Sequence, residues 1–122
     1  MLESTAPPRA DLSPLVSLMR GHRAVVLAGA GCSTESGIPD YRGPEGRLHT
    51  RTPVQYGDFV RSTATRQRYW ARSTVGWGRM HRAEPNPTHY ALADLERQGH
   101  VSGLITQNVD GLHLRAGSRE VV

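Results

Sequence analysis

One short segment constrains the fold of this chain more than any other: an apolar run that ends directly in a glycine-rich loop. Residues 23–28 (RAVVLA) are apolar and β-branched, as in a buried parallel strand, and residues 29–43 (GAGCSTESGIPDYRG) follow at once. Gly29 and Gly31 lack side chains where a pyrophosphate must approach the backbone, and the next N–H groups can donate to phosphate oxygens at a helix start. The pattern predicts the strand-to-loop junction of a dinucleotide site in an α/β fold.

The loop departs from the dehydrogenase fingerprint in two respects. Thr34 stands where a third glycine is expected, three residues after Gly31, and the next glycine is Gly37. No isolated acidic residue follows about 20 residues later, at the end of a second strand, to hold a ribose hydroxyl. The glycine spacing alone is therefore a weak match.

A second polar cluster follows a second apolar run. Residues 101–105 (VSGLI) predict another strand, and residues 106–117 (TQNVDGLHLRAG) come directly after it. Both clusters leave the carboxyl end of a strand, where open α/β sheets bind their ligands. Gln107, Asn108 and Asp110 suit ribose hydroxyls better than a core, although an Asx turn is the alternative for Asn108.

Three segments in this order resemble the sirtuins, the NAD-dependent protein deacylases: GAGCSTESGIPDYRG, the PNPTH run at 85–89, and TQNVDGLH. The resemblance implies NAD as cofactor, an acyl-lysine protein as substrate, and an incomplete Rossmann-like parallel sheet with a helical small-domain insertion. The run RQRYWARSTVGW at 66–77 is similar to the class II branch, which includes the mitochondrial ADP-ribosyltransferase and lipoamidase type. Protein mono-ADP-ribosylation and a non-catalytic NAD-binding remnant are the alternative functions.

The resemblance also assigns cofactor contacts to both polar clusters. Within them, Arg42 is expected to make a charge-assisted contact near the cofactor, and Tyr41 to shield the nicotinamide–ribose bond from water. Ile38 and Asp110 fit the nicotinamide carboxamide. Ser33 has a helix cap as its alternative role. The full predicted set is Gly29, Ala30, Gly31, Ser33, Glu35, Ile38, Pro39, Asp40, Tyr41, Arg42, Gln107, Asn108, Val109 and Asp110.

Other residues that carry chemistry receive mainly structural assignments. His113 belongs to the second motif, but in the family it is not the base that deprotonates the ribose, so a packing or hydrogen-bonding role is favoured. His89 is expected to brace a helix start against the cofactor loop, and Cys32 to be a small apolar filler. Tyr69 and Arg72 share one face of a predicted helix and match a pair that receives an acyl carboxylate, with an aromatic anchor and an exposed arginine as the equal alternative.

Several parts of the family pattern are missing from these residues. The catalytic histidine is expected just beyond Val122, so no catalytic residue is assigned within the chain, which is expected to be inactive alone. The family's structural zinc needs four cysteines, whereas Cys32 is the single cysteine, so the zinc module is absent and no metal ligand is assigned. The chain is interpreted as the amino-terminal portion of a sirtuin.

The predicted organisation is a disordered lead at 1–10 and a sirtuin portion at 11–122, in which 43–85 form a cofactor loop and the helical insertion. Three helices are expected. One is capped by Ser13 and packs on the sheet through Leu15, Val16 and Met19. Another runs from a cap at Asp58 to about Trp77. The third starts at Asn86 and Pro87, has an apolar face of Tyr90, Ala91, Leu92 and Leu95, and ends at Gly99.

Composition limits the other function classes. All fifteen Lys-plus-Arg residues are arginine and they are scattered, so the net charge of +4 predicts a solvated surface and no specific nucleic-acid partner. The absence of lysine beside plentiful Arg, Ala and Gly suggests a bacterial gene. No leader-like apolar run or membrane span is visible, and a single cysteine fits a reducing compartment, so a cytoplasmic location is expected. No oligomeric state is predicted.

Overall fold

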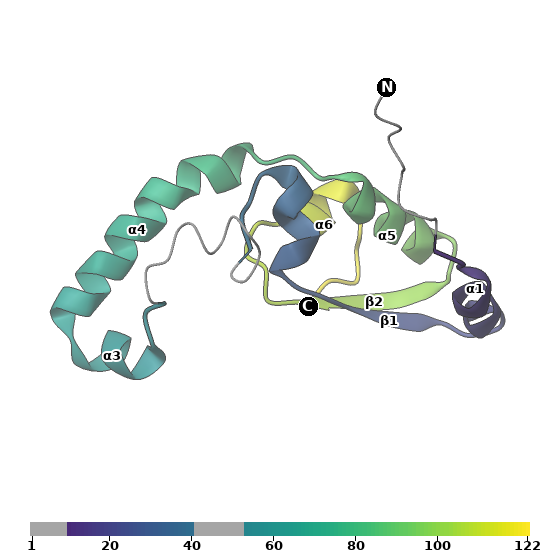
Figure 1. Cartoon of the computed structure of the whole chain (residues 1–122), viewed down its shortest axis with the longest axis horizontal. Coiled ribbons are helices and arrows are strands. Elements are labelled where there is room, and N and C mark those ends of the chain that lie inside the picture. The colour runs from purple at the N-terminus through teal and green to yellow at the C-terminus, as the bar shows by residue number, and fades with distance from the viewer. Residues whose placement is uncertain (1–9, 41–52) are drawn as a thin grey trace, which may run out of the picture.

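The computed structural model describes residues 10–40 and 53–122 as an α/β structure. Tyr41, Arg42, the loop residues 43–52 and residues 1–9 of the lead predicted at 1–10 lie outside the described residues. Figure 1 shows the elements in order: α1 (Ser13–Met19), β1 (Ala24–Ala28), the 3-10 helix η1 (Ala30–Ser36), α3 (Tyr56–Arg61), α4 (Thr63–Arg82), α5 (Pro87–Arg97), β2 (Val101–Thr106) and α6 (Leu112–Ala116). The predicted fold class is confirmed.

The two strands pair in parallel and align their carboxyl ends. Ala28 of β1 lies opposite Thr106 of β2, and Val26 lies opposite Leu104. Parallel strands require a crossover connection, and here the chain between them contains α3, α4 and α5. Because both strands run the same way, the loops that follow Ala28 and Thr106 emerge at the same edge of the sheet. This register positions the candidate site.

The core lies on one face of the sheet. Figure 1 shows η1, α5 and α6 on the same side of the two strands. Val101, Leu104 and Leu112 are at most 2% exposed, and Ala93 of α5 is also buried. The opposite face is open: Val25, Leu27 and Ile105 are 63%, 82% and 47% exposed. The expectation that the first strand is buried on both faces is therefore wrong for the described residues.

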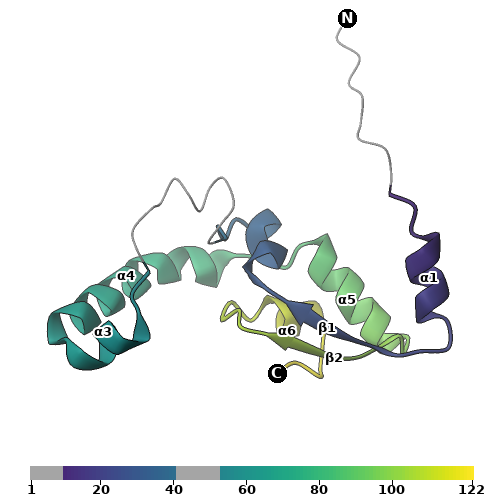
Figure 2. The ribbon, with the colours of Figure 1, turned by 60° about the horizontal axis from the view of Figure 1, so that its bottom comes forward.

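Helix α1 does not pack on the sheet, contrary to the sequence expectation. It has no buried residue, and Figures 1 and 2 place it at the end of the strands remote from η1. Leu15 and Val16 are about half exposed. Ser13 is also not the cap: Leu12 holds that position without a side-chain bond, and Asp11 Oδ1 accepts from Ser13 N. Two exposed apolar side chains on a helix of two turns give little burial to hold it against the sheet.

The predicted helix from Asp58 to Trp77 is divided into two helices. α3 ends at Arg61, and Ser62 caps α4 by accepting a hydrogen bond from Thr65 N through its side chain. The ring of Tyr69 in α4 packs edge-on against Phe59 in α3, with ring centroids 5.1 Å apart. Figure 2 shows the α3–α4 pair extending away from the sheet. A serine that satisfies its own helix start explains the break, which the apolar periodicity did not reveal.

Helix α5 begins where the sequence predicted, but it buries a different face. Asn86 is its cap and Pro87 its first residue, and Gly99 adopts a left-handed backbone with φ 82° just after its end. His89 and Ala93 are buried, whereas Tyr90 is 50% exposed. Tyr90 and Ala91 therefore do not belong to the packed face.

No helix in the described part is long and apolar enough to cross a membrane.

The residues after α6 extend the sheet beyond β2. Leu104 N donates to Glu120 O, and Val122 N donates to Leu104 O, at 2.8 and 2.9 Å. Glu96 of α5 holds this segment: its carboxylate accepts from Arg119 N at 3.1 Å and from Glu120 N at 2.9 Å. The backbone N–H of Glu120, followed by that of Arg119, keeps the pKa of the Glu96 carboxyl below its usual value, against the effect of desolvation.

This hydrogen bonding makes part of the stability depend on pH. A carboxyl whose pKa is lowered in the folded state stabilises it above the unfolded pKa, about 4.3, and this contribution is lost as pH falls through the folded pKa. We expect Glu96→Gln, which does not titrate, to be less stable than the parent at neutral pH and to lose less stability on acidification. Urea unfolding from neutral pH to about pH 3 checks this, and parallel pH profiles for the two proteins would contradict it.

Candidate functional site

The glycine-rich loop and the second polar cluster meet in direct hydrogen-bond contact. Ser33 Oγ donates to Asp110 Oδ2 at 2.6 Å, and Asn108 Nδ2 donates to Gly29 O at 3.0 Å and to Ser33 Oγ at 3.4 Å. The structure thus brings together two segments about 75 residues apart in the sequence, as the parallel strand arrangement predicted. This contact forms the centre of the candidate site.

Gly29 and Gly31 leave open space next to the backbone. A Cβ added to either would meet no described atom within 4 Å, and neither residue has a positive φ. Neither local packing nor backbone conformation therefore requires glycine at these positions. Close approach by a bound group is the reason given for glycines in dinucleotide loops, and the space next to these two residues among the described atoms is compatible with it.

Two of the alternatives raised by the sequence are settled by these contacts. Ser33 does not cap a helix, because it lies inside η1 and its hydroxyl binds Asp110. Asn108 forms no Asx turn in the described contacts, since its amide reaches across to Gly29. The turn is formed by Asp110 instead, whose Oδ1 accepts from Leu112 N at 2.9 Å. Both carboxylate oxygens of Asp110 are thereby fixed in place.

The start of α5 is held against η1 by hydrogen bonds. This agrees with the prediction that His89 braces a helix start against the cofactor loop. Asn86 Nδ2 donates to Cys32 O at 2.8 Å and to Ser36 Oγ at 3.1 Å, while its Oδ1 caps the helix by accepting from Thr88 N. His89 Nδ1 completes a capping box by accepting from Asn86 N at 3.1 Å. Asn86 itself is a contributor that sequence analysis assigned only to the helix cap.

His89 and His113 form a buried pair. They are 0% and 2% exposed, and their ring centroids lie 4.7 Å apart. Burial lowers the pKa of both imidazoles, and His89 lowers that of His113 further, although Asp110 acts in the opposite direction on both. Both rings are therefore neutral at neutral pH and shielded from solvent. This geometry confirms the packing role expected of His113 and removes it as a base acting on a bound ligand.

A groove of about 340 Å³ lies beside Asp110. Trp77 stacks on His81 along one wall, with ring centroids 5.9 Å apart. Arg115 is held in place by Glu84 Oε1, at 2.7 Å, and by Ala83 O. The groove is lined by Trp77, Met80, His81, Asp110 and Arg115, and only Asp110 was predicted as a site residue. The aromatic pair is spaced at i, i+4 on α4, which is the one signal that could have indicated it.

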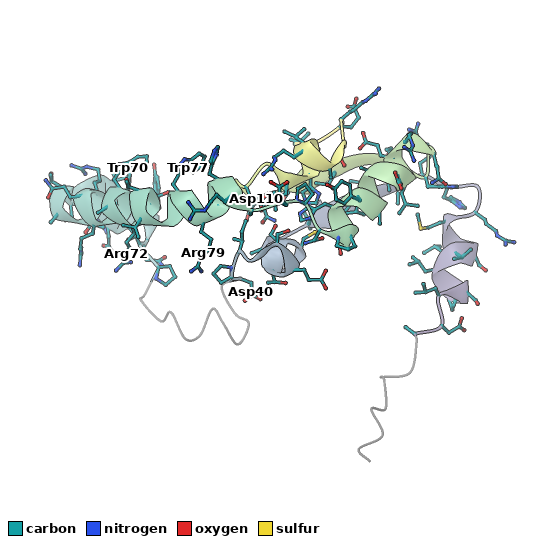
Figure 3. The ribbon with its side chains drawn as sticks, turned by 90° about the horizontal axis from the view of Figure 1, so that it is seen from above. Asp40, Trp70, Arg72, Trp77, Arg79 and Asp110 are labelled. Atoms are coloured by element: carbon teal, nitrogen blue, oxygen red, sulfur yellow. The ribbon has the colours of Figure 1, made fainter. Side chains whose placement is uncertain are left out.

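Tyr69 and Arg72 both lie on α4, as the sequence predicted. Figure 3 shows Arg72 and Arg79 projecting to the side opposite Trp70 and Trp77. Tyr69 is 41% exposed and its ring packs on Phe59, which agrees with the aromatic-anchor alternative. The role of the pair toward an acyl group stays a prediction. So do all the predicted cofactor contacts, both those of the residues at the junction and those of Ala30, Glu35, Ile38, Pro39, Asp40, Gln107 and Val109, which lie in or beside the two joined segments.

Comparison with known sequences identifies the family. Residues 29–122 match the Sir2 family, so the chain belongs to it. It is 52% identical over 113 residues to NAD-dependent protein deacetylase 1 of Corynebacterium efficiens. The aligned region covers 93% of this chain and 40% of that protein. It is 51% identical over 114 residues to the mitochondrial NAD-dependent protein lipoamidase sirtuin-4 of Homo sapiens, covering 91% of this chain and 36% of that protein.

Solved sirtuin structures share the fold. A complex described as Sir2, p53 peptide and NAD+ superposes with a TM-score of 0.78 at 35% identity, covering 93% of this chain and 45% of that one. A Sir2 structure bound to acetylated peptide gives a TM-score of 0.73 at 32% identity. The chain therefore spans less than half the length of the relatives and structures that it matches.

The Asn86 contacts generate a test of the brace. Asn86→Ala removes both the helix cap, worth about 1 kcal/mol, and the two donor bonds to η1, worth about 1 kcal/mol each. Asn86→Asp keeps the cap acceptor but removes the donors. We expect both variants to unfold at lower urea concentration, with Asn86→Ala the less stable. A stability of Asn86→Asp equal to that of the parent would show that the bonds to Cys32 O and Ser36 Oγ contribute nothing.

Proposed function

We propose that this chain carries part of the NAD-binding site of a protein-lysine deacylase. The observation that carries the proposal is the hydrogen-bonded junction of Ser33, Asn108 and Asp110 beside the open backbone of Gly29 and Gly31. Family membership and the structural match to a Sir2 complex with peptide and NAD+ support it. The activity, substrate and partners of the whole protein belong to the same proposal.

The described residues fit a dinucleotide. The open space at Gly29 and Gly31 accepts a pyrophosphate, whereas a Cβ at either position would enter that space. Gln107 is exposed, and its side chain makes no hydrogen bond to the described residues that would compete with ribose hydroxyls. When bound, NAD supplies an ADP-ribosyl group that is transferred as its bond to nicotinamide breaks. The residues of this chain then have to position that bond and keep water away from it.

Asp110 is the residue best placed to orient the nicotinamide end. Its carboxylate is fixed by Ser33 Oγ and Leu112 N, and it lines the groove beneath the α4 aromatic pair. Preorganised polar groups of this kind need no rearrangement when the reacting bond breaks. His89 and His113 are buried, so neither is placed to act as the general base.

Two other functions fit the same cofactor site. A class II member could transfer ADP-ribose to a protein, and a chain without a base could bind NAD without turnover. Incubation of the purified protein with NAD and an acetyl-lysine peptide distinguishes the three. Peptide-dependent nicotinamide release with loss of the acetyl group supports the deacylase. Label transfer from NAD to protein supports the transferase, and binding without nicotinamide release supports the remnant.

Ser33→Ala is expected to weaken NAD binding by about 10-fold. The change leaves Asp110 Oδ2 without its 2.6 Å donor, and a hydrogen bond to a charged group contributes about 1.5–3 kcal/mol. Thr34→Ala is the matched control, because the neighbouring Thr34 hydroxyl is exposed and donates only to Gly31 O within the described contacts. Calorimetric titration with NAD measures both affinities. An equal loss in the two variants would contradict a specific role for Ser33.

Acyl specificity is tested at Arg72. If Tyr69 and Arg72 receive an acyl carboxylate, Arg72→Met should lower turnover of succinyl- or glutaryl-lysine far more than that of acetyl-lysine, because the carboxylate loses its charge-assisted partner. Arg97→Met is the control, since Arg97 is exposed on α5 and paired with Asp94. Equal losses on all acyl groups would reduce the Tyr69–Arg72 pair to a structural role.

A further inference from the structure

A thiol and two imidazoles converge behind the cofactor loop, and the proposed function does not use them. Cys32 comes from η1, His89 from α5 and His113 from α6. One potential ligand atom from each lies within 4.8 Å of the others. The two histidines are buried, whereas Cys32 is partly exposed and gives the cluster a path to solvent. The three residues are called the Cys32 cluster below.

His113 is the anomalous member of the Cys32 cluster. Both of its ring nitrogens are buried and have no hydrogen-bond partner among the described residues. A buried polar group left unpaired costs about 1–3 kcal/mol, so native structures rarely keep one without a reason. Burial lowers the pKa of this imidazole, which leaves one nitrogen with a free lone pair. That lone pair can ligate a metal ion and has no partner in the part of the chain that the structure describes.

His89 plays a different part, because its proton is fixed. Its Nδ1 accepts from the backbone N–H of Asn86, so in the neutral ring the proton resides on Nε2. Nε2 lies 4.0 Å from Cys32 Sγ and donates toward the sulfur. His89 therefore cannot ligate a metal through Nε2 while the capping box of α5 stays intact. It can instead stabilise a thiolate at Cys32.

We propose that Cys32 Sγ and a ring nitrogen of His113 form a two-donor site for a soft monovalent cation, for which Cu+ is the probe. Thiolate sulfur selects soft ions such as Cu+ and Zn2+. In a buried site the charge decides between them: Cu+ with one thiolate is neutral, whereas Zn2+ leaves an uncompensated charge. This site is separate from the four-cysteine zinc module, whose ligands the sequence lacks.

The geometry allows both bonds after a small movement. An ion bonded to sulfur at ~2.3 Å and to imidazole nitrogen at ~2.0 Å, lengths usual for such ligands, spans at most ~4.3 Å. The donor atoms lie within 4.8 Å of each other, so closing the site needs a shift of about half an ångström or less. Binding forms one S–Cu and one N–Cu bond, and the thiol proton leaves to solvent. No electron is transferred.

Ligation would tie together the two segments that carry the cofactor junction. Cys32 precedes Ser33 in η1, and His113 lies in α6 just after Asp110. Burial raises the pKa of the Cys32 thiol, with smaller contributions from Asp110 and Glu35, so without metal the cluster keeps its proton. A bound soft cation replaces that proton and adds a covalent link beside the Ser33–Asp110 hydrogen bond.

Anaerobic titration of the purified protein with Cu+, against a competing chelator, tests the site. We expect one Cu+ per chain, and Cys32→Ser and His113→Asn should each lower affinity by more than the roughly 10–100-fold that loss of an outer hydrogen bond costs a metal site. His100→Asn is the control. His100 is exposed and directly precedes the amino end of β2, away from the Cys32 cluster, so this variant should bind Cu+ like the parent. Circular dichroism establishes that each variant is folded.

X-ray absorption at the copper edge keeps the test decisive even where His113→Asn does not fold. One sulfur and one nitrogen donor at bonding distance supports the site. Sulfur coordination without nitrogen would overturn it, as would equal affinity in the parent and Cys32→Ser. Tighter binding of Zn2+ than of Cu+ would also overturn it, because the choice of a monovalent ion rests on charge neutrality in the buried cluster.

Discussion

The parallel pairing of β1 with β2 is the constraint on which the rest of the structure depends. Residue 28 opposite residue 106 brings the two loops that form the candidate site to one edge of the sheet. The Ser33–Asp110 bond of 2.6 Å then converts proximity into a defined position for the carboxylate. A one-residue slip in register would separate these groups, because alternate residues face opposite sides of a strand.

A second layer of polar contacts supports this junction from the α5 side. Asn86 satisfies its own helix start and at the same time donates to two acceptors of η1. Because Asn86 binds both local and distant partners, the start of α5 and the packing of η1 depend on the same side chain. This coupling explains why a 3-10 helix of 7 residues, too short to be stable alone, keeps a defined place above the sheet.

Sequence analysis located the strands, the α5 start and the joined segments because each has a strong local signal. These signals depend only on residues adjacent in the sequence. They are the apolar β-branched run that ends in Gly-Ala-Gly and the Asn-Pro pair before a helix. The break at Ser62 was missed because a serine can lie either inside a helix or at its cap. Which of the two it adopts depends on tertiary packing, which the local sequence does not show. The groove wall formed by Trp77 and His81 was missed because it depends on where α4 leads, which no local pattern fixes.

The open face of the sheet shows that the sequence of a strand does not determine whether both of its faces are covered. Val25, Leu27 and Ile105 have the composition of a doubly covered parallel strand, and the sequence pattern correctly reports that preference. In the described residues only one face is covered, so three apolar side chains stay partly in water, and each forgoes part of the roughly 1.5–3 kcal/mol that full burial would give. Strand preference thus records the environment for which a segment is suited, whereas actual burial depends on which other elements reach that face.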